Sequence, residues 1–125
     1  MTFGEQIQEA NKTATNYPDL VSKLISIGVQ SYTVDVASGI VLYRFEGAVH
    51  ELHQKNKIER IVRDEFSYDL TVKAVKDTQQ GKTNYPEFLN DIAMAGVRFY
   101  EATLKGNLRV TYIGAGGMYE ESIPV

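Results

Sequence analysis

The chain has 125 residues, a formal net charge of −3 from 16 acidic and 13 basic residues, and no cysteine. A hydrophobic content of 43% with 23% charged residues excludes a disordered chain and is typical of a globular domain. The charges form no long run of one sign, and cysteine chemistry is excluded. Since the start has no signal-peptide pattern and no apolar stretch is long enough to span a bilayer, the sequence predicts a soluble cytoplasmic protein without nucleic-acid or membrane partners.

One sequence pattern occurs twice. The run Thr-Asn-Tyr-Pro at 15–18 returns at 83–86, and the same offset of 68 carries three more residues into the second copy: Gly28, Val29 and Tyr32 become Gly96, Val97 and Tyr100. We therefore expect two repeats, at about 2–52 and 68–125, joined by a connector at about 53–67. Each repeat alone is too small for a stable core, so the sequence predicts one domain, 1–125, with a shared core.

Each repeat begins with the pattern of two helices. Apolar residues at helical spacing predict a helix over about 2–14, and its counterpart covers about 68–80 after Ser67, a residue suited to the N-cap. A second helix begins at Pro18 and at Pro86, because proline in the first turn loses no needed hydrogen bond.

These second helices end at glycine. Gly28 and Gly96 follow the last apolar position of each helix. A helix often ends with a residue in the left-handed backbone conformation, which glycine alone adopts freely. We expect replacement of either glycine with valine to destabilise the fold.

Three strands complete each repeat. The hydrophobic period changes to two after each Gly-Val, and the predicted strands cover about 32–36, 40–45 and 48–52 in the first repeat and about 100–104, 108–113 and 118–123 in the second. The fold class is α+β. Antiparallel strands form one sheet or two packed sheets, helices cover one side, and the repeats are related by a pseudo-twofold axis. The connector fits either a helical turn or an extension of a strand.

Several short runs together form a pattern that covers nearly the whole chain: Gln80-Gly81, Asn84 to Phe88, Ala95 to Val97 with Tyr100, Thr111-Tyr112, Gly114 to Tyr119, and Ile123-Pro124. This pattern resembles the YbcV-like family of uncharacterised bacterial and phage-associated proteins, sometimes labelled phage envelope protein-like. The resemblance implies a phage-related protein and brings no established activity, cofactor or catalytic residue.

The repeated helix starts are the first candidate site. Asn16 and Tyr17, with Asn84 and Tyr85, place two amides and two phenols where they can converge near the pseudo-axis, and free N–H groups at a helix start suit an anionic ligand. The structural alternative, which we favour, is that asparagine caps each helix while tyrosine fastens the loop to the core.

The strand tyrosines are the second candidate site. Tyr32 and Tyr100 are equivalent, and a pocket lined by such tyrosines suits a flat or sugar-like ligand. The favoured alternative makes them core residues or part of a dimer face.

Metal and phosphate sites are not predicted. His50 and His53 would point to opposite faces of one strand and share no ligand spacing with the nearby acids. The glycine-rich run 114–117 leads into a strand, which indicates a hairpin turn and not a phosphate-binding loop. We expect no cofactor.

The favoured function is a non-enzymatic binding or interaction module whose partner is a small molecule, another protein, or a second copy in a homodimer formed through exposed strand edges. The alternative is a small enzyme at the pseudo-axis, with Tyr17 or Tyr85 as the acid. Its base would be one of three carboxylates: Asp35, Asp19 or Glu87. The enzyme hypothesis requires a tyrosine hydroxyl within hydrogen-bond reach of a carboxylate inside a cleft.

Overall fold

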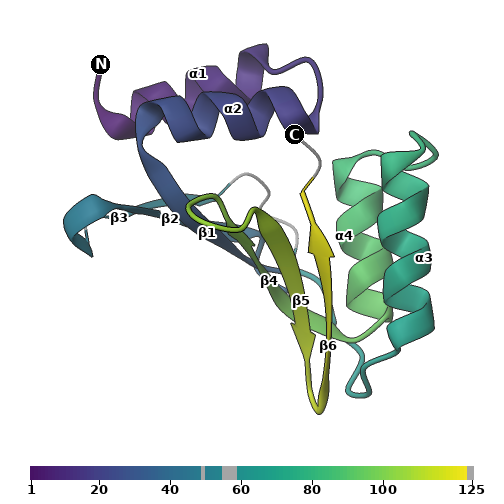
Figure 1. The fold of residues 1–125 in the computed structure, drawn as a ribbon. Coiled ribbons are helices and arrows are strands. Elements are labelled where there is room, and N and C mark those ends of the chain that lie inside the picture. The colour runs from purple at the N-terminus through teal and green to yellow at the C-terminus, as the bar shows by residue number, and fades with distance from the viewer. Residues whose placement is uncertain (49, 55–58, 124–125) are drawn as a thin grey trace.

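The computed structural model describes residues 1–48, 50–54 and 59–123 and shows the same element order twice (Figure 1). The first repeat contains α1 (Phe3–Thr13), α2 (Tyr17–Ile27), β1 (Val29–Asp35), β2 (Ile40–Phe45) and β3 (His50–Gln54). The second contains α3 (Tyr68–Gln79), α4 (Tyr85–Met94), β4 (Val97–Thr103), β5 (Arg109–Gly114) and β6 (Gly117–Ser122). The α+β class and the repeated helix-helix-strand order are confirmed.

The helix starts are fixed by side-chain caps. Thr2 and Glu5 form a capping box at α1, in which each side chain accepts a hydrogen bond from the other residue's backbone N–H. Ser67 caps α3, as the sequence predicts. These caps satisfy N–H groups that the first helical turn leaves without a partner.

Glycine ends both second helices in the left-handed conformation. Gly28 has φ 107° and directly precedes β1, and Gly96 has φ 84° and directly precedes β4. Because this conformation is strained for any other residue, the two glycines set the reversal from helix to strand at the same place in both repeats.

The six strands form one antiparallel sheet in the order β3-β2-β1-β4-β5-β6. The repeats meet at β1 and β4, where Thr33 pairs with Glu101. These two residues are equivalent, 68 positions apart, so the pseudo-twofold axis passes between them. Of the two sheet arrangements that the sequence allows, the structure therefore has the single sheet.

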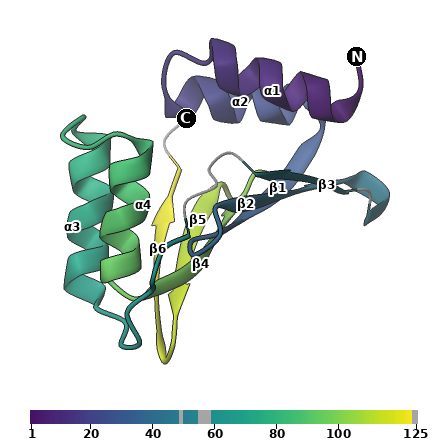
Figure 2. The same ribbon diagram turned by 180° about the vertical axis from the view of Figure 1, so that it is seen from behind.

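Both helix pairs cover the same face of the sheet. On that face the side chains of Tyr32, Val34, Tyr43, Tyr100 and Tyr112 are buried. Figures 1 and 2 show α1 and α2 near one end of the strands, with α3 and α4 set apart at the side of β6. The sheet centre therefore lies between two separate helix pairs.

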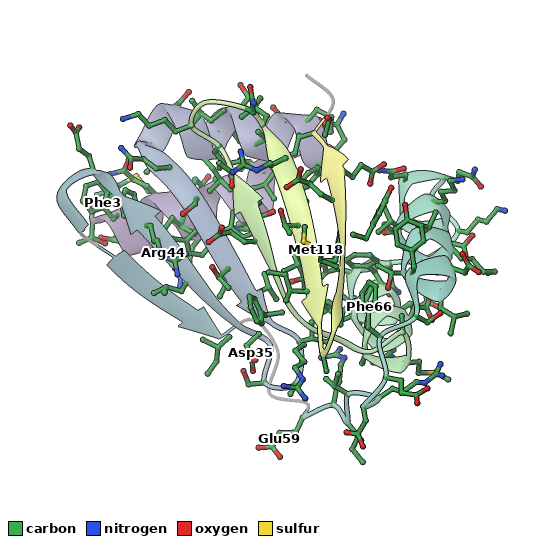
Figure 3. All side chains as sticks on the ribbon, turned by 60° about the horizontal axis from the view of Figure 1, so that its bottom comes forward. Phe3, Asp35, Arg44, Glu59, Phe66 and Met118 are labelled. Atoms are coloured by element: carbon green, nitrogen blue, oxygen red, sulfur yellow. The ribbon has the colours of Figure 1, made fainter. Side chains whose placement is uncertain are left out.

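The other face of the sheet carries polar groups at the axis. Arg44 Nη1 donates to Thr33 Oγ1 at 2.7 Å and lies 3.4 Å from Glu101 Oε2. Figure 3 looks onto this face, with Arg44 in front of the strands. Both charged side chains are nearly half exposed, so the ion pair contributes little stability.

The connector contains neither a helical turn nor a strand within 59–67, and residues 55–58 lie outside the described part. Its backbone follows the end of α4, where Arg63 N–H donates to Ala93 O and Ser67 N–H donates to Ala95 O. The Phe66 ring lies against Gly114 and Gly117, where no side chain occupies the space, and the backbone of Glu65 and Phe66 lies against Gly96. Those backbone hydrogen bonds and this ring hold the connector in an extended path.

The third strand of the first repeat begins at His50, two residues later than predicted. A short 3-10 turn occupies Glu46–Ala48, with Gly47 at φ 75°. This turn includes Ala48, the residue at which the sequence predicts the start of the strand. The run 114–117 forms the predicted hairpin turn, in which Gly114 pairs with Gly117.

Candidate ligand-binding site

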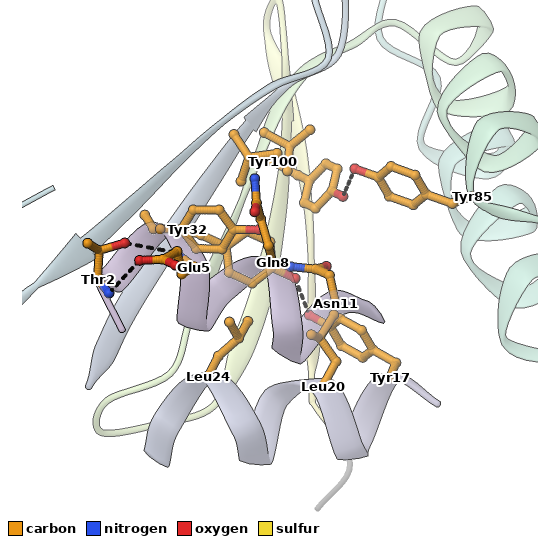
Figure 4. Close-up of a pocket in the computed structure, with 14 residues that line it drawn as sticks. Thr2, Glu5, Gln8, Asn11, Tyr17, Leu20, Leu24, Tyr32, Tyr85 and Tyr100 are labelled. Carbon is orange, nitrogen blue, oxygen red and sulfur yellow. Dashed lines mark hydrogen bonds between the residues drawn. The ribbon is translucent and has the colours of Figure 1, made fainter. Parts of the chain in front are cut away.

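A cleft of about 980 Å³ lies between the first helix pair and the helix-covered face of the sheet (Figure 4). Five tyrosines from both repeats line it: Tyr17, Tyr32, Tyr43, Tyr85 and Tyr100. We call this space the tyrosine cleft. Its volume lies at the upper end of the range that small-molecule sites usually have.

Two pairs of tyrosine hydroxyls meet in the cleft. The Tyr17 and Tyr32 hydroxyl oxygens are 2.7 Å apart, and those of Tyr85 and Tyr100 are 3.2 Å apart. In each repeat the pair joins the first residue of the second helix to the strand beside the axis. Figure 4 shows both pairs with their hydroxyls directed toward each other.

The central register of the sheet explains why the pairs lie close together. Tyr32 precedes Thr33 and Tyr100 precedes Glu101, and those two following residues face each other across the axis. Side chains alternate between faces, so both tyrosines project from the helix-covered face on either side of the axis. The repeat and the antiparallel register together create the constellation.

Burial keeps these phenols protonated. It raises the pKa of Tyr17 and Tyr85, and it raises the pKa of Tyr32 and Tyr100 well above the ordinary value. The hydrogen bond between the Tyr17 and Tyr32 hydroxyls partly opposes the rise in the pKa of Tyr17. At neutral pH the hydroxyls are therefore uncharged groups that can both donate and accept hydrogen bonds.

Helix α1 adds further polar groups. Gln8 and Asn11 line the cleft with neutral amides, and Asn11 Nδ2 donates to the Ile7 carbonyl at 2.9 Å. Glu5 contributes a carboxylate, and its hydrogen bond from the Thr2 backbone lowers its pKa. These groups occupy the first-repeat side of the cleft.

Aliphatic side chains form the remaining wall. Leu20 and Leu24 come from α2, Val34 from β1 and Val41 from β2. Leu24, Val34 and Val41 are fully buried, which fixes their positions. The cleft therefore joins an apolar wall to a group of uncharged hydrogen-bonding side chains.

The structure brings together four of the six predicted site residues. Tyr17, Tyr32, Tyr85 and Tyr100 all line the cleft, whereas Asn16 and Asn84 are the N-caps of α2 and α4. Their Oδ1 atoms accept from the N–H groups of Asp19 at 2.8 Å and Glu87 at 2.9 Å. This geometry is the capping alternative, and a ligand-binding role for the two asparagines stays a prediction.

The sequence does not single out Glu5, Gln8 and Asn11 as site residues. They lie on the polar side of an amphipathic helix, and the same pattern is expected of a helix face in contact with water. The sequence carries no signal that separates the two cases, because the difference depends on where α1 packs on the sheet.

The three candidate bases have other partners. Asp35 Oδ2 accepts from the Ser38 backbone N–H at 3.1 Å, and Asp19 Oδ2 accepts from the Thr15 backbone N–H at 3.0 Å. Glu87 Oε1 accepts from Asn84 N–H at 3.0 Å. These carboxylates stabilise turns and helix starts, and the geometry pairs the cleft hydroxyls with one another.

The described residues contain no cluster of three or more side chains suited to holding a metal ion. His50 and His53 belong to β3, but their side chains are not among those that the structure describes. The prediction that these two histidines do not bind a metal ion is therefore not tested.

No helix in the described ranges is both long and apolar enough to cross a membrane.

Comparison with known proteins places the chain in a family. No curated protein matches the chain. A family described as "Protein of unknown function (DUF1398)" matches residues 5–120, which is nearly the whole sequence. The chain therefore belongs to the DUF1398 family of proteins of unknown function.

Proposed function

We propose that this protein is a non-enzymatic binding module that holds a small organic molecule in the tyrosine cleft. The observation that carries the proposal is the meeting of two hydroxyl pairs, one from each repeat, in one cleft of about 980 Å³. Ligand sites combine a mainly apolar concave surface with a few placed polar groups, and the tyrosine cleft has both.

The hydrogen-bond partners of the tyrosine hydroxyls favour a binding role over a catalytic one. A tyrosine acid or base needs a nearby group that accepts or supplies its proton during the reaction. Tyr17 is hydrogen-bonded to Tyr32, and burial raises the pKa of both phenols. Phenols of this kind form hydrogen bonds well and exchange protons poorly at neutral pH, which supports binding over acid–base chemistry.

The test is a thermal-shift screen of the purified protein against uncharged, cationic and anionic metabolites, repeated with Tyr17→Phe and Tyr85→Phe. Tyr68→Phe is the matched control, because Tyr68 starts α3, contacts Tyr119 and is not a cleft residue. A ligand at about 100 times its Kd adds about 2.7 kcal/mol to the stability of the folded protein.

We expect at least one compound to raise Tm. Its Kd should rise about five- to tenfold in Tyr17→Phe or Tyr85→Phe, the effect of losing one hydrogen bond, and should be unchanged in Tyr68→Phe. A screen without hits, or hits equally strong in both cleft variants, would contradict the proposal.

A homodimer is a second proposal, and it has its own observation. On the uncovered sheet face Phe99 lies beside Ile113, and Ile113 lies beside Met118, in an apolar row across three strands. Phe99 is 37% and Met118 is 53% exposed. Sedimentation of the wild type and of Met118→Lys tests it: a dimer that the substitution dissociates supports the proposal, and a monomeric wild type contradicts it. The phage relation remains a proposal that rests on the YbcV-like resemblance alone, and the cytoplasmic location remains a prediction from the sequence.

A further inference from the structure

We infer that the ligand of the tyrosine cleft is uncharged, with a hydroxyl or carbonyl group at the paired tyrosines and a flat apolar body against α2 and β2. This inference rests on the proposed function and names the class of ligand for the same site. Three features of the described residues carry it: the charges around the cleft, the orientation of the rings, and the separation of polar from apolar lining.

The charges disfavour an anion. Among the described residues that line the cleft, none is lysine, arginine or histidine, and the single charged side chain is the carboxylate of Glu5. An anion would lose part of its hydration without gaining a counter-charge from them, which disfavours its binding. Arg60 influences Tyr85 from outside the lining, and its Nε–H donates to Asn90 Oδ1 on α4 at 2.7 Å.

The ring orientation disfavours an organic cation. A cation is held best over the face of an aromatic ring. The Tyr32 and Tyr43 rings lie against each other, with centroids 5.6 Å apart and planes tilted by 38°, and Tyr100 lies against Tyr112 at 5.4 Å in the same way. Tyr32, Tyr43 and Tyr100 are also buried, so little of these rings is open to a cation. The Glu5 carboxylate is the remaining group that could attract a cation. It is exposed to water and already accepts a hydrogen bond from Thr2 N–H, so its attraction is weak.

The lining favours an uncharged ligand with two unlike ends. Around the axis the polar groups are phenols and amides, all neutral and able to donate and accept. Away from them lies the half-buried side chain of Leu20, beside the buried side chains of Leu24, Val34 and Val41. An apolar body that covers the exposed part of Leu20 gains free energy. A ring compound that carries a hydroxyl or carbonyl group satisfies both parts.

The test uses three probes that share an indole ring and differ in the charge of the side group: tryptophol is neutral, tryptamine is a cation and indole-3-acetate is an anion. Each is titrated calorimetrically into the wild type, Tyr17→Phe, Tyr85→Phe and Tyr68→Phe. Tyr68 contacts Tyr119 and is not a cleft residue, so Tyr68→Phe removes a tyrosine hydroxyl outside the proposed site.

We expect tryptophol to bind at least about tenfold more tightly than either charged probe. Its binding should weaken in Tyr17→Phe or Tyr85→Phe and should be unchanged in Tyr68→Phe. If tryptamine or indole-3-acetate binds as tightly as tryptophol and weakens in the same tyrosine variant, the inference is overturned and the proposed function stands. If no indole binds, the charge of the tyrosine-dependent hits in the metabolite screen decides: uncharged hits support the inference, and charged hits overturn it. A screen without tyrosine-dependent hits overturns the proposed function and the inference with it.

Discussion

In the first repeat β2 ends with Phe45, whose buried ring stacks on Phe3 with centroids 4.2 Å apart. In the second repeat the equivalent residue at the end of β5 is Gly114, and Phe66 of the connector covers it. Both repeats therefore place an aromatic ring beside the end of the middle strand, but one ring comes from the strand and the other from the connector. Close packing therefore requires that the space beside the end of the middle strand be filled, and it does not fix which segment fills that space.

The loops before the second helices differ in a similar way. In the first repeat the shorter acid, Asp19, accepts from the backbone of Thr15, whereas in the second the longer Glu87 accepts from the helix cap Asn84. Thr83, the equivalent of Thr15, has a buried hydroxyl without a hydrogen-bond partner among the described residues. The tyrosine pairs, in contrast, are present in both repeats.

The largest expected change is a loss of stability at alkaline pH, to which buried tyrosines of both repeats contribute. Burial raises the pKa of Tyr43 to about 12 and that of Tyr32, Tyr100 and Tyr112 as well. Above pH 10 the unfolded chain loses tyrosine protons that the native state keeps, so the free energy of unfolding falls as pH rises. At pH 11 each buried tyrosine should contribute a loss of about 1.4 kcal/mol.

Urea unfolding between pH 8 and pH 11 measures this loss. The midpoint should be level up to about pH 9.5 and then fall steeply, and Tyr43→Phe should make the fall shallower. A midpoint that stays constant through pH 11 would show that these phenols titrate equally in both states.

The next effect separates the repeats at their helix-ending glycines. A Cβ at Gly96 would overlap the Glu65 carbonyl, whereas at Gly28 its nearest neighbour is Phe45 Cδ1 at 4.0 Å. Gly28→Ala should cost about 1–2 kcal/mol from the positive φ alone, and Gly96→Ala about 1–3 kcal/mol more because the connector must move. Chemical denaturation of the two variants checks the difference, and equal losses would contradict the close contact.

The two aromatic rings give a smaller difference. Phe66→Ala should destabilise the protein by about 3 kcal/mol, because the ring fills the space left by Gly114 and Gly117. Phe3 is 40% exposed, so Phe3→Ala should cost only about 1 kcal/mol, mainly the loss of stacking on Phe45. Thermal unfolding ranks the two variants, and the reverse order would mean that the connector is not part of the packed structure.

The smallest effect concerns the unpaired hydroxyl. Thr83→Val keeps the shape of the side chain and removes a buried group without a partner, so stability should be unchanged or rise by up to about 1 kcal/mol. Thr15→Val is the matched control at the equivalent position, where the hydroxyl is exposed. A clear loss of stability in Thr83→Val alone would indicate that the hydroxyl does have a partner.

Much of the fold follows from local chemistry that the sequence displays. Ser67 and the two asparagines cap helices, and Gly28 and Gly96 end helices with positive φ. The strand β3 was harder to place, because a 3-10 turn through Gly47 delays its start and such a turn leaves little pattern. The packing of Phe66 could not be predicted, since it depends on missing side chains at glycines from three other places in the chain.

The candidate site was predictable only where it is repeated. Tyr17 and Tyr85 stand out because their motif occurs twice, and Tyr32 with Tyr100 follows from the same offset. Gln8 and Asn11 belong to no such pattern, and their place in the cleft depends on how α1 packs on the sheet. Tertiary packing, and not local sequence, decides which polar helix face lines the cleft.

The cleft is built around a symmetry axis but is not itself symmetric. Among the described residues that line it, the second repeat supplies Tyr85 and Tyr100, while α1 and its N-cap in the first repeat supply Thr2, Gly4, Glu5, Gln8 and Asn11. A site with true twofold symmetry would accept a ligand equally well in two opposite orientations. Here those two orientations would present different surroundings to the same molecule, so a ligand bound in the cleft would have a single preferred head and tail.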